Sequence, residues 1–149
     1  SNVGSAVFRQ LNFTDSELRE LSEKATIDMG KELGYIYYPI AGNKGERFPC
    51  NDPNLKPIIE PVPDSRKEFM CGLFHSIARI EKEGYDLLHE LGAEPKVVSI
   101  KTSGGGAQND LWTEIRARKL GIPVEKAVNT DPAYGVALLG LKKPLDRNQ

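Results

Sequence analysis

Three consecutive glycines, Gly104, Gly105 and Gly106, follow a short apolar run and open an amphipathic stretch, and this junction constrains the fold more than any other feature. Because glycine has no Cβ, the backbone here can adopt positive φ and approach another group closely. A helix that begins just behind the glycines would present unpaired N–H groups, which favour anions and polar ligands. Glycine runs also occur in plain strand-to-helix turns, so the run alone leaves a ligand loop and a simple turn open.

The residues around the glycines predict a strand, a loop, a helix and a second strand. Residues 96–100 read as a short buried strand, and Asn109 or Asp110 can cap the helix that follows. Gly121 is placed to end this helix, and residues 123–124 start the next extended piece.

Two further helices are predicted upstream. Thr14 and Glu17 form a capping box before one of them, with apolar residues at helical spacing up to Met29. A second, longer helix ends at Gly92, and its apolar stripe predicts a face turned toward the core. That stripe consists of Phe69, Leu73, Ile77, Ile80, Leu87 and Leu91.

Two segments depart from this regular pattern. Residues 39–64 hold six of the ten prolines, which predicts an ordered, extended excursion in which Glu46 and Arg47 either form a local ion pair or belong to a loop that lines a cleft. Near the end, Asp131 is placed to cap a helix of small residues. Gly135 and Gly140 lower the helix propensity there, so we expect close packing to compensate.

Composition narrows the function classes. A chain of 149 residues with 39% hydrophobic residues is long enough for one domain. Its net charge of −1 and the lack of a basic block argue against nucleic acid or an anionic membrane as partner. Cys50 and Cys71 fit no disulfide framework or metal spacing, and His75 and His89 lie too far apart on one helix to share a metal. We expect a cytoplasmic protein, or a plastid one if a transit peptide has been removed.

Several segments resemble the C-terminal domain of the FGGY carbohydrate kinases. The resemblance rests on residues 104–112 (Gly-Gly-Gly-Ala-Gln-Asn-Asp-Leu-Trp), on 121–124 (Gly-Ile-Pro-Val) and on 133–140 (Ala-Tyr-Gly-Val-Ala-Leu-Leu-Gly). It extends to 45–49 (Gly-Glu-Arg-Phe-Pro) and to 1–4, which are similar to the end of the family's Gly-Ala-Ser-Asn-x-Gly segment. The amino-acid sequence of residues 76–81 and 85–88 is most similar to that of the ribulose and xylulose kinases of photosynthetic organisms.

The resemblance implies an α/β fold of the actin-like ATPase (ribonuclease H-like) superfamily, with a central sheet and helices on its faces. Residues 1–149 would form the C-terminal, nucleotide-binding half of a kinase that transfers the γ-phosphoryl group of ATP, with Mg²⁺, to a sugar such as ribulose or xylulose. The implied ATP and ADP site consists of Gly104, Gly105, Gly106 and Ala107 beside the ribose and α-phosphate, and Gln108, Asn109 and Asp110 on the adenine side. For Asn109, a role as helix cap competes with ligand contact. The closing helix is expected to pack against the nucleotide-binding side.

The family's catalytic aspartate lies upstream of the segment that residues 1–4 match, so we expect no catalytic residue and no metal ligand in this chain. The sugar would bind through an N-terminal domain, and the chain alone would be inactive. Two alternatives stay open: a nucleotide-binding module of the same superfamily without sugar chemistry, and a non-catalytic interaction domain in which the glycines only form a turn. A homodimer is also open.

Overall fold

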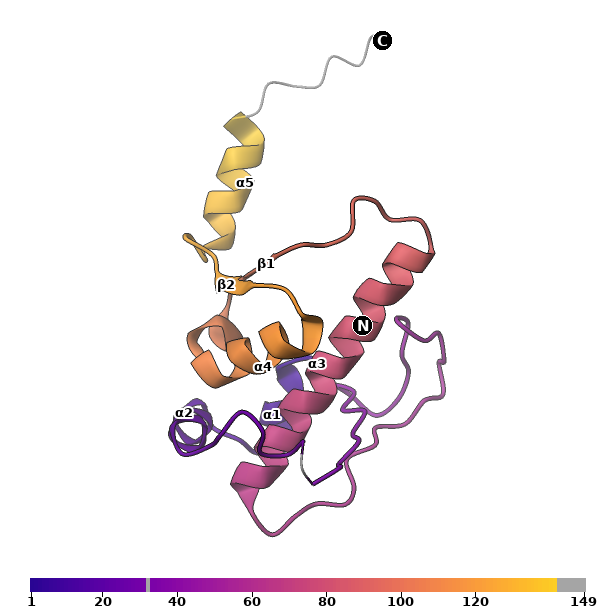
Figure 1. Ribbon diagram of the computed structural model, residues 1–149, viewed down its shortest axis with the longest axis vertical. Helices are drawn as coiled ribbons and strands as arrows, with labels where there is room; N and C mark the ends of the chain where they lie inside the picture. Colours follow the sequence, from indigo (N-terminus) through magenta and orange to yellow (C-terminus); the bar gives the residue numbers. More distant parts are fainter. Residues whose placement is uncertain (32, 142–149) are drawn as a thin grey trace.

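The computed structural model describes residues 1–31 and 33–141, with the backbone alone at Pro132. Figure 1 shows a long central helix with shorter helices beside it. The elements are α1 (Ala6–Gln10), α2 (Asp15–Glu23), α3 (Arg66–Glu90), β1 (Ile100–Thr102), the 3-10 helix η1 (Gly105–Gln108), α4 (Asp110–Leu120), β2 (Val124–Lys126) and α5 (Pro132–Leu141). Helix α3 contacts both α2 and α4, and these contacts organise the fold.

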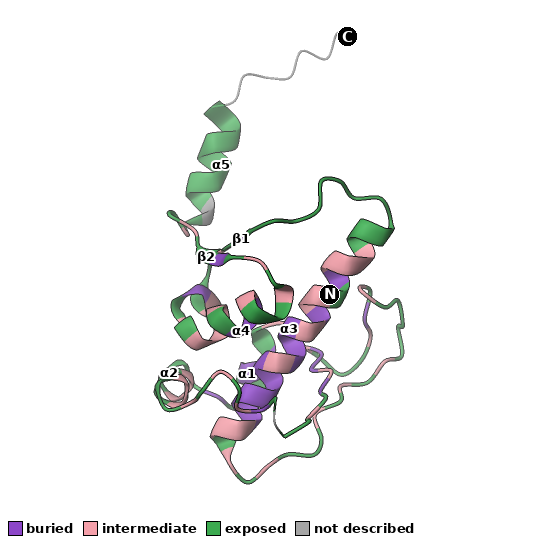
Figure 2. Ribbon diagram, viewed as in Figure 1, coloured by how far each residue is buried: buried purple, intermediate pink, exposed green. Residues whose placement is uncertain are grey.

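The core lies around the first half of α3, which Figure 2 shows as the most continuous buried stretch. Phe8 of α1 joins it, in edge-to-face contact with Phe74 at 5.1 Å between ring centroids. The predicted apolar stripe is confirmed from Phe69 to Ile80. It is wrong at Leu91, which is 72% exposed, because the last turns of α3 extend beyond the helices that cover its first half.

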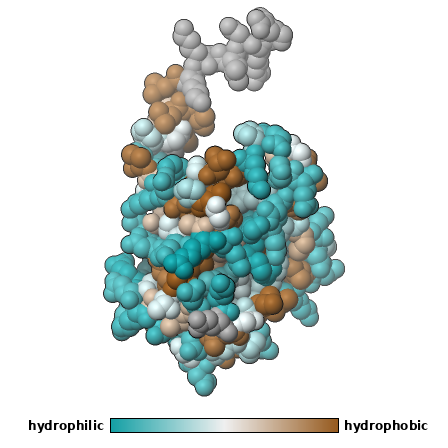
Figure 3. Space-filling model, viewed as in Figure 1, coloured by the Kyte–Doolittle hydropathy of each residue, from teal (hydrophilic) through white to brown (hydrophobic). Residues whose placement is uncertain are grey.

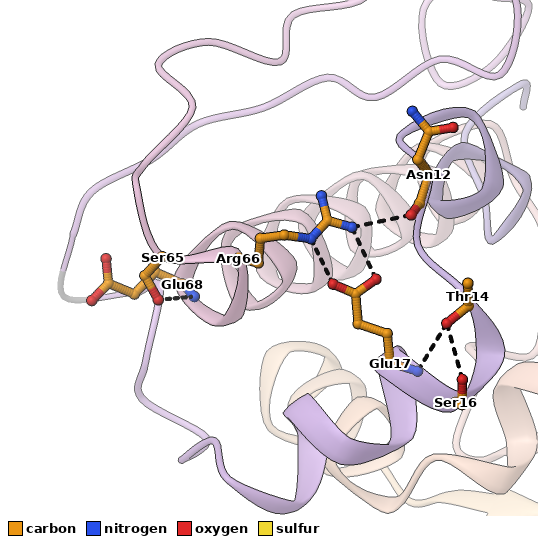
Figure 4. Close-up of polar contacts among 7 residues, drawn as sticks. All are labelled: Asn12, Thr14, Ser16, Glu17, Ser65, Arg66 and Glu68. Carbon is orange, nitrogen blue, oxygen red and sulfur yellow. Dashed lines mark hydrogen bonds and ion pairs between the residues drawn. The ribbon is translucent and has the colours of Figure 1, made fainter.

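A polar cluster joins the start of α2 to the start of α3 (Figure 4). Thr14 Oγ1 accepts the N–H of Glu17 at 3.1 Å, which confirms the predicted cap. The Glu17 carboxylate accepts two bonds from Arg66, at 2.6 and 3.0 Å, and Arg66 also donates to the carbonyl of Asn12. Helix α3 has its own cap, Ser65. The Glu17–Arg66 pair therefore links the first turn of α2 to the first turn of α3.

The two strands form a parallel pair connected by α4. Ile100 pairs with Val124 and Thr102 with Lys126. The predicted strand at 96–100 is wrong in its bounds, because β1 begins only at Ile100 and Val98 is 75% exposed. The partner strand β2 is three residues long and begins at Val124, which pairs with Ile100. Residues 96–99 therefore have no partner strand with which to form backbone hydrogen bonds. Within residues 1–31 and 33–141 the sheet has two strands, so the predicted α/β class is confirmed, and the expected central sheet with helices on its faces is present only in part.

The proline-rich segment is extended, as predicted. Tyr38 and Ile58 exchange backbone hydrogen bonds at 2.8 and 3.0 Å, and Glu46 pairs in the same way with Asp52. These isolated bridges order the segment without building a sheet.

Helix α5 projects away from the rest of the described chain (Figure 1) and presents an apolar surface (Figure 3). Asp131 Oδ1 accepts the N–H of Ala133 at 2.9 Å, which confirms the predicted cap. The expected close packing is wrong for the described residues, since Val136 and Leu139 are 69% and 68% exposed. A helix that is apolar on all sides is usually covered by other elements, and none of the described elements covers α5. Among the described helices, none combines the length and apolar character needed to cross a membrane.

Candidate functional site

The glycine run connects β1 to α4, with Gly104 in a left-handed backbone conformation that suits glycine. Gly104 has φ 81° and ψ −171°, a backbone that residues with a Cβ rarely adopt. Gly105 begins η1 at ordinary φ, and a Cβ placed there would meet no atom within 4 Å. A Cβ on Gly106 would lie 3.4 Å from Trp112 Nε1. The run therefore has one position that needs glycine for its φ and one that leaves room for a ligand.

The glycine run lines a cavity of about 1090 Å³. Six of the seven predicted site residues lie on its wall: Gly104, Gly105, Gly106, Gln108, Asn109 and Asp110. Ala107 does not, because it is buried behind the loop with 5% exposure. Apolar side chains of α1 and α3, among them Phe8 and Ile77, form much of the remaining wall. The cavity is large enough for a nucleotide-sized ligand, since pockets for small molecules measure roughly 300–1000 Å³.

Asn109 is the N-cap of α4. Its Oδ1 accepts the N–H of Trp112 at 2.9 Å, and its Nδ2 donates to Ser22 Oγ of α2 at 2.7 Å. The side-chain amide therefore has both ends engaged within the protein, which favours the cap over ligand contact. Gln108 is exposed and accepts a bond from Lys126 Nζ at 2.6 Å, while Asp110 is exposed at the first turn of α4.

A largely buried ion pair that the sequence analysis missed lies on the cavity wall. Arg116 is 8% exposed and forms a bidentate pair with Glu81 of α3, with N–O distances of 2.7 and 2.6 Å. Its remaining Nη1 donates to Thr102 Oγ1 at 3.0 Å. Charged residues alternate along both helices, so no pattern in the sequence marks these two as buried.

Residues near the N-terminus and in the proline-rich segment also line the cavity, and Glu46 joins these two parts of the chain. Its carboxylate is 1% exposed and accepts bonds at 2.8 Å from the Ser1 hydroxyl and from the N–H groups of Asn2 and Arg47. Burial raises the pKa of Glu46, but these donors together outweigh it, so this pKa lies below its ordinary value.

The expected ion pair between Glu46 and Arg47 is wrong, because the carboxylate is buried and binds the backbone of Arg47. The other expectation for this loop, that it lines a cleft, agrees with Phe48 and Pro49 on the cavity wall.

Metal ligands are not gathered anywhere in residues 1–31 and 33–141, where no group of three or more His, Cys, Asp or Glu side chains could hold an ion. His75 is half-buried, with Nε2 2.8 Å from the carbonyl of Ile27. Burial lowers the pKa of His75, which favours the neutral, packed form.

Comparison with known proteins adds an independent observation. The model of the FGGY family of carbohydrate kinases, C-terminal domain, matches residues 3–143. A xylulose kinase from Bacillus subtilis is 30% identical over 109 residues, which cover 71% of the chain and 21% of that protein. A rhamnulokinase from Bacteroides thetaiotaomicron is 29% identical over 80 residues, which cover 54% of the chain and 16% of that protein. The match therefore spans about a fifth or less of the length of these curated relatives.

Proposed function

Because the chain belongs to the FGGY family of carbohydrate kinases, as a C-terminal domain, we propose that it is the ATP-binding part of a kinase that phosphorylates a sugar hydroxyl. One observation carries the proposal for this site: the glycine run opens onto the large cavity, with room at Gly105 for a ligand to approach the backbone. An ordinary turn would need no such cavity beside it.

The residues present fit a nucleotide better than they fit a metal ion. The backbone around Gly105 and Gly106 would face the ribose and α-phosphate, where N–H donors are favourable. Gln108 and Asp110 would lie on the adenine side, while Asn109 orients the first turn of α4 as its cap. When bound with Mg²⁺, ATP supplies the phosphoryl group to be transferred. With no carboxylate cluster in the described chain, Mg²⁺ would depend on the phosphates and on groups elsewhere.

The chemistry assigned to this chain is binding and orientation. Rigid contacts behind the loop would keep the nucleotide aligned, and the cavity walls would exclude water. We assign the base and most sugar contacts to a second domain, as in a two-domain kinase with an interdomain cleft. The broader sheet of the actin-like fold and a partner surface for α5 would also lie outside the described residues.

A pentulose is the proposed acceptor. The similarity to a xylulose kinase and the amino-acid sequence of residues 76–81 support this choice. The similarity to a rhamnulokinase leaves rhamnulose, a deoxyhexulose, as the alternative acceptor.

Sugar-dependent release of ADP tests the proposal on a full-length protein that contains this chain. We expect turnover with xylulose or ribulose, none with glycerol, and none by the chain alone. Release of ADP without any sugar dependence would favour a nucleotide-binding module that lacks sugar chemistry. If the protein bound neither ATP nor ADP, the remaining alternative would be a non-catalytic interaction domain in which the glycines only form a turn.

A further inference from the structure

Arg116 is the one arginine or lysine among the described residues that is buried. Removing a guanidinium from water is costly unless its donors are paired. Here Nε and Nη2 pair with the Glu81 carboxylate, and Nη1 pairs with Thr102 Oγ1. The planar fork of arginine suits this three-point contact, which a lysine ammonium could not reproduce with the same geometry.

These contacts reach both ends of the glycine run. Thr102 is the last residue of β1 and stands two positions before Gly104. At the other end, the Arg116 guanidinium lies 5.5 Å from the centroid of Trp112, and Trp112 Nε1 lies beside Gly106. Arg116 thus contacts Thr102, which precedes the run, and the ring of Trp112, which packs beside Gly106 at its other end.

The first two glycines of the run have no close packing of their own. A Cβ at either Gly104 or Gly105 would meet no atom within 4 Å, so no packed neighbour fixes these two residues. The hydrogen bonds of the turn are internal, such as that from the Ala107 N–H to the carbonyl of Gly104 at 3.2 Å. The far end of the run is held by the bond from Lys126 to Gln108 and by the Asn109 cap, whereas its entrance is held by the sheet pairing of Thr102 and by the contact of Thr102 with Arg116.

We propose that Arg116, oriented by Glu81, is a positioning residue that holds the glycine run in the geometry required for nucleotide binding. The inference rests on the proposed function of the same site. Helix α3 supplies Glu81, α4 supplies Arg116 and β1 supplies Thr102, so one guanidinium sets the spacing of three elements at the cavity wall.

Isothermal titration with MgATP, on the full-length protein and well below each variant's unfolding temperature, separates positioning from simple stabilisation. Arg116→Met keeps the aliphatic stem and should raise the Kd for MgATP about 10-fold, the effect of one lost charged hydrogen bond. Arg116→Lys can pair with Glu81 and should recover much of the unfolding temperature while its Kd stays raised. Arg118→Met, which loses only the exposed pair with Glu114, is the control and should leave the Kd unchanged.

Thr102→Val removes the acceptor but keeps the ion pair, so it should raise the Kd while lowering the unfolding temperature less than Arg116→Met does. This variant decides the matter if Arg116→Met does not fold. The double variant Arg116→Met with Thr102→Val should bind no more weakly than Arg116→Met alone, because both changes remove the same contact.

Folded Arg116→Met or Thr102→Val protein with the wild-type Kd would overturn the positioning role, and so would additive losses in the double variant. A wild-type protein that does not bind MgATP would instead refute the proposed function, and this inference with it.

Discussion

Substituting Gly105 by valine tests the nucleotide site with the least disturbance to the fold. The φ of Gly105 is not in the left-handed region, and a Cβ there would meet no protein atom within 4 Å, so the fold accommodates the valine side chain. We expect a change in the free energy of unfolding of no more than about 1 kcal/mol, the range of helix propensities.

The effect on ligand binding should be much larger. The valine methyl groups would occupy the space through which the ligand approaches the backbone, and at least one hydrogen bond to a phosphate would be lost. A bond to a charged group contributes about 1.5–3 kcal/mol, which corresponds to a loss of affinity of about 10- to 100-fold. Isothermal titration with MgATP, together with thermal unfolding, measures both quantities.

A matched control is available in Gly135→Val on α5, where a Cβ would also meet no atom within 4 Å. This variant should bind MgATP like the wild type. A folded Gly105→Val protein with an unchanged Kd would refute the assignment of the glycine run to the nucleotide.

Three further substitutions probe the walls of the cavity. Trp112→Ala should lower the free energy of unfolding by about 3 kcal/mol, because the ring is half-buried and packs against Phe74 at 5.1 Å, and a urea titration showing no loss would contradict this packing. Glu46 has a pKa held below the ordinary 4.5, so its stabilising contribution is complete above that pH and is lost as the pH falls through the lowered pKa. Glu46→Gln should therefore be less stable at pH 7 and lose less stability on acidification, whereas a variant with a wild-type pH profile of unfolding would show that the carboxylate is not ionised in the fold. Asn109→Ala should cost about 1 kcal/mol as a lost cap while Asn109→Asp keeps the cap, and equal stability of the two by urea titration would refute the capping role.

Local signals in the sequence predicted much of the fold. The Thr14 and Asn109 caps, the left-handed Gly121 at the end of α4 and the start of β2 were readable because each depends on one or two neighbouring residues. The bounds of β1 were not, because they depend on the length of a partner strand distant in sequence. Helix α1 was missed entirely, since five residues carry too little periodicity to reveal a helix.

Long-range pairing limits what could be foreseen of the site. The glycine run was identified from its composition, yet the Arg116 pair with Glu81 joins residues 35 positions apart and has no sequence pattern. Glu46 was noted for its neighbour Arg47, but its partners Ser1 and Asn2 lie more than 40 residues away. Contacts of this kind depend on the completed fold, and only the structure shows them.

The central claim, that nucleotide binds at the glycine run, is tested most directly by a crystal structure of the full-length protein with a non-hydrolysable ATP analogue and Mg²⁺. The account predicts the ribose and α-phosphate beside the backbone of Gly105 and Gly106, with the adenine toward Gln108 and the cap contact of Asn109 to Trp112 intact. An analogue bound elsewhere, with the glycine run facing empty solvent, would contradict it.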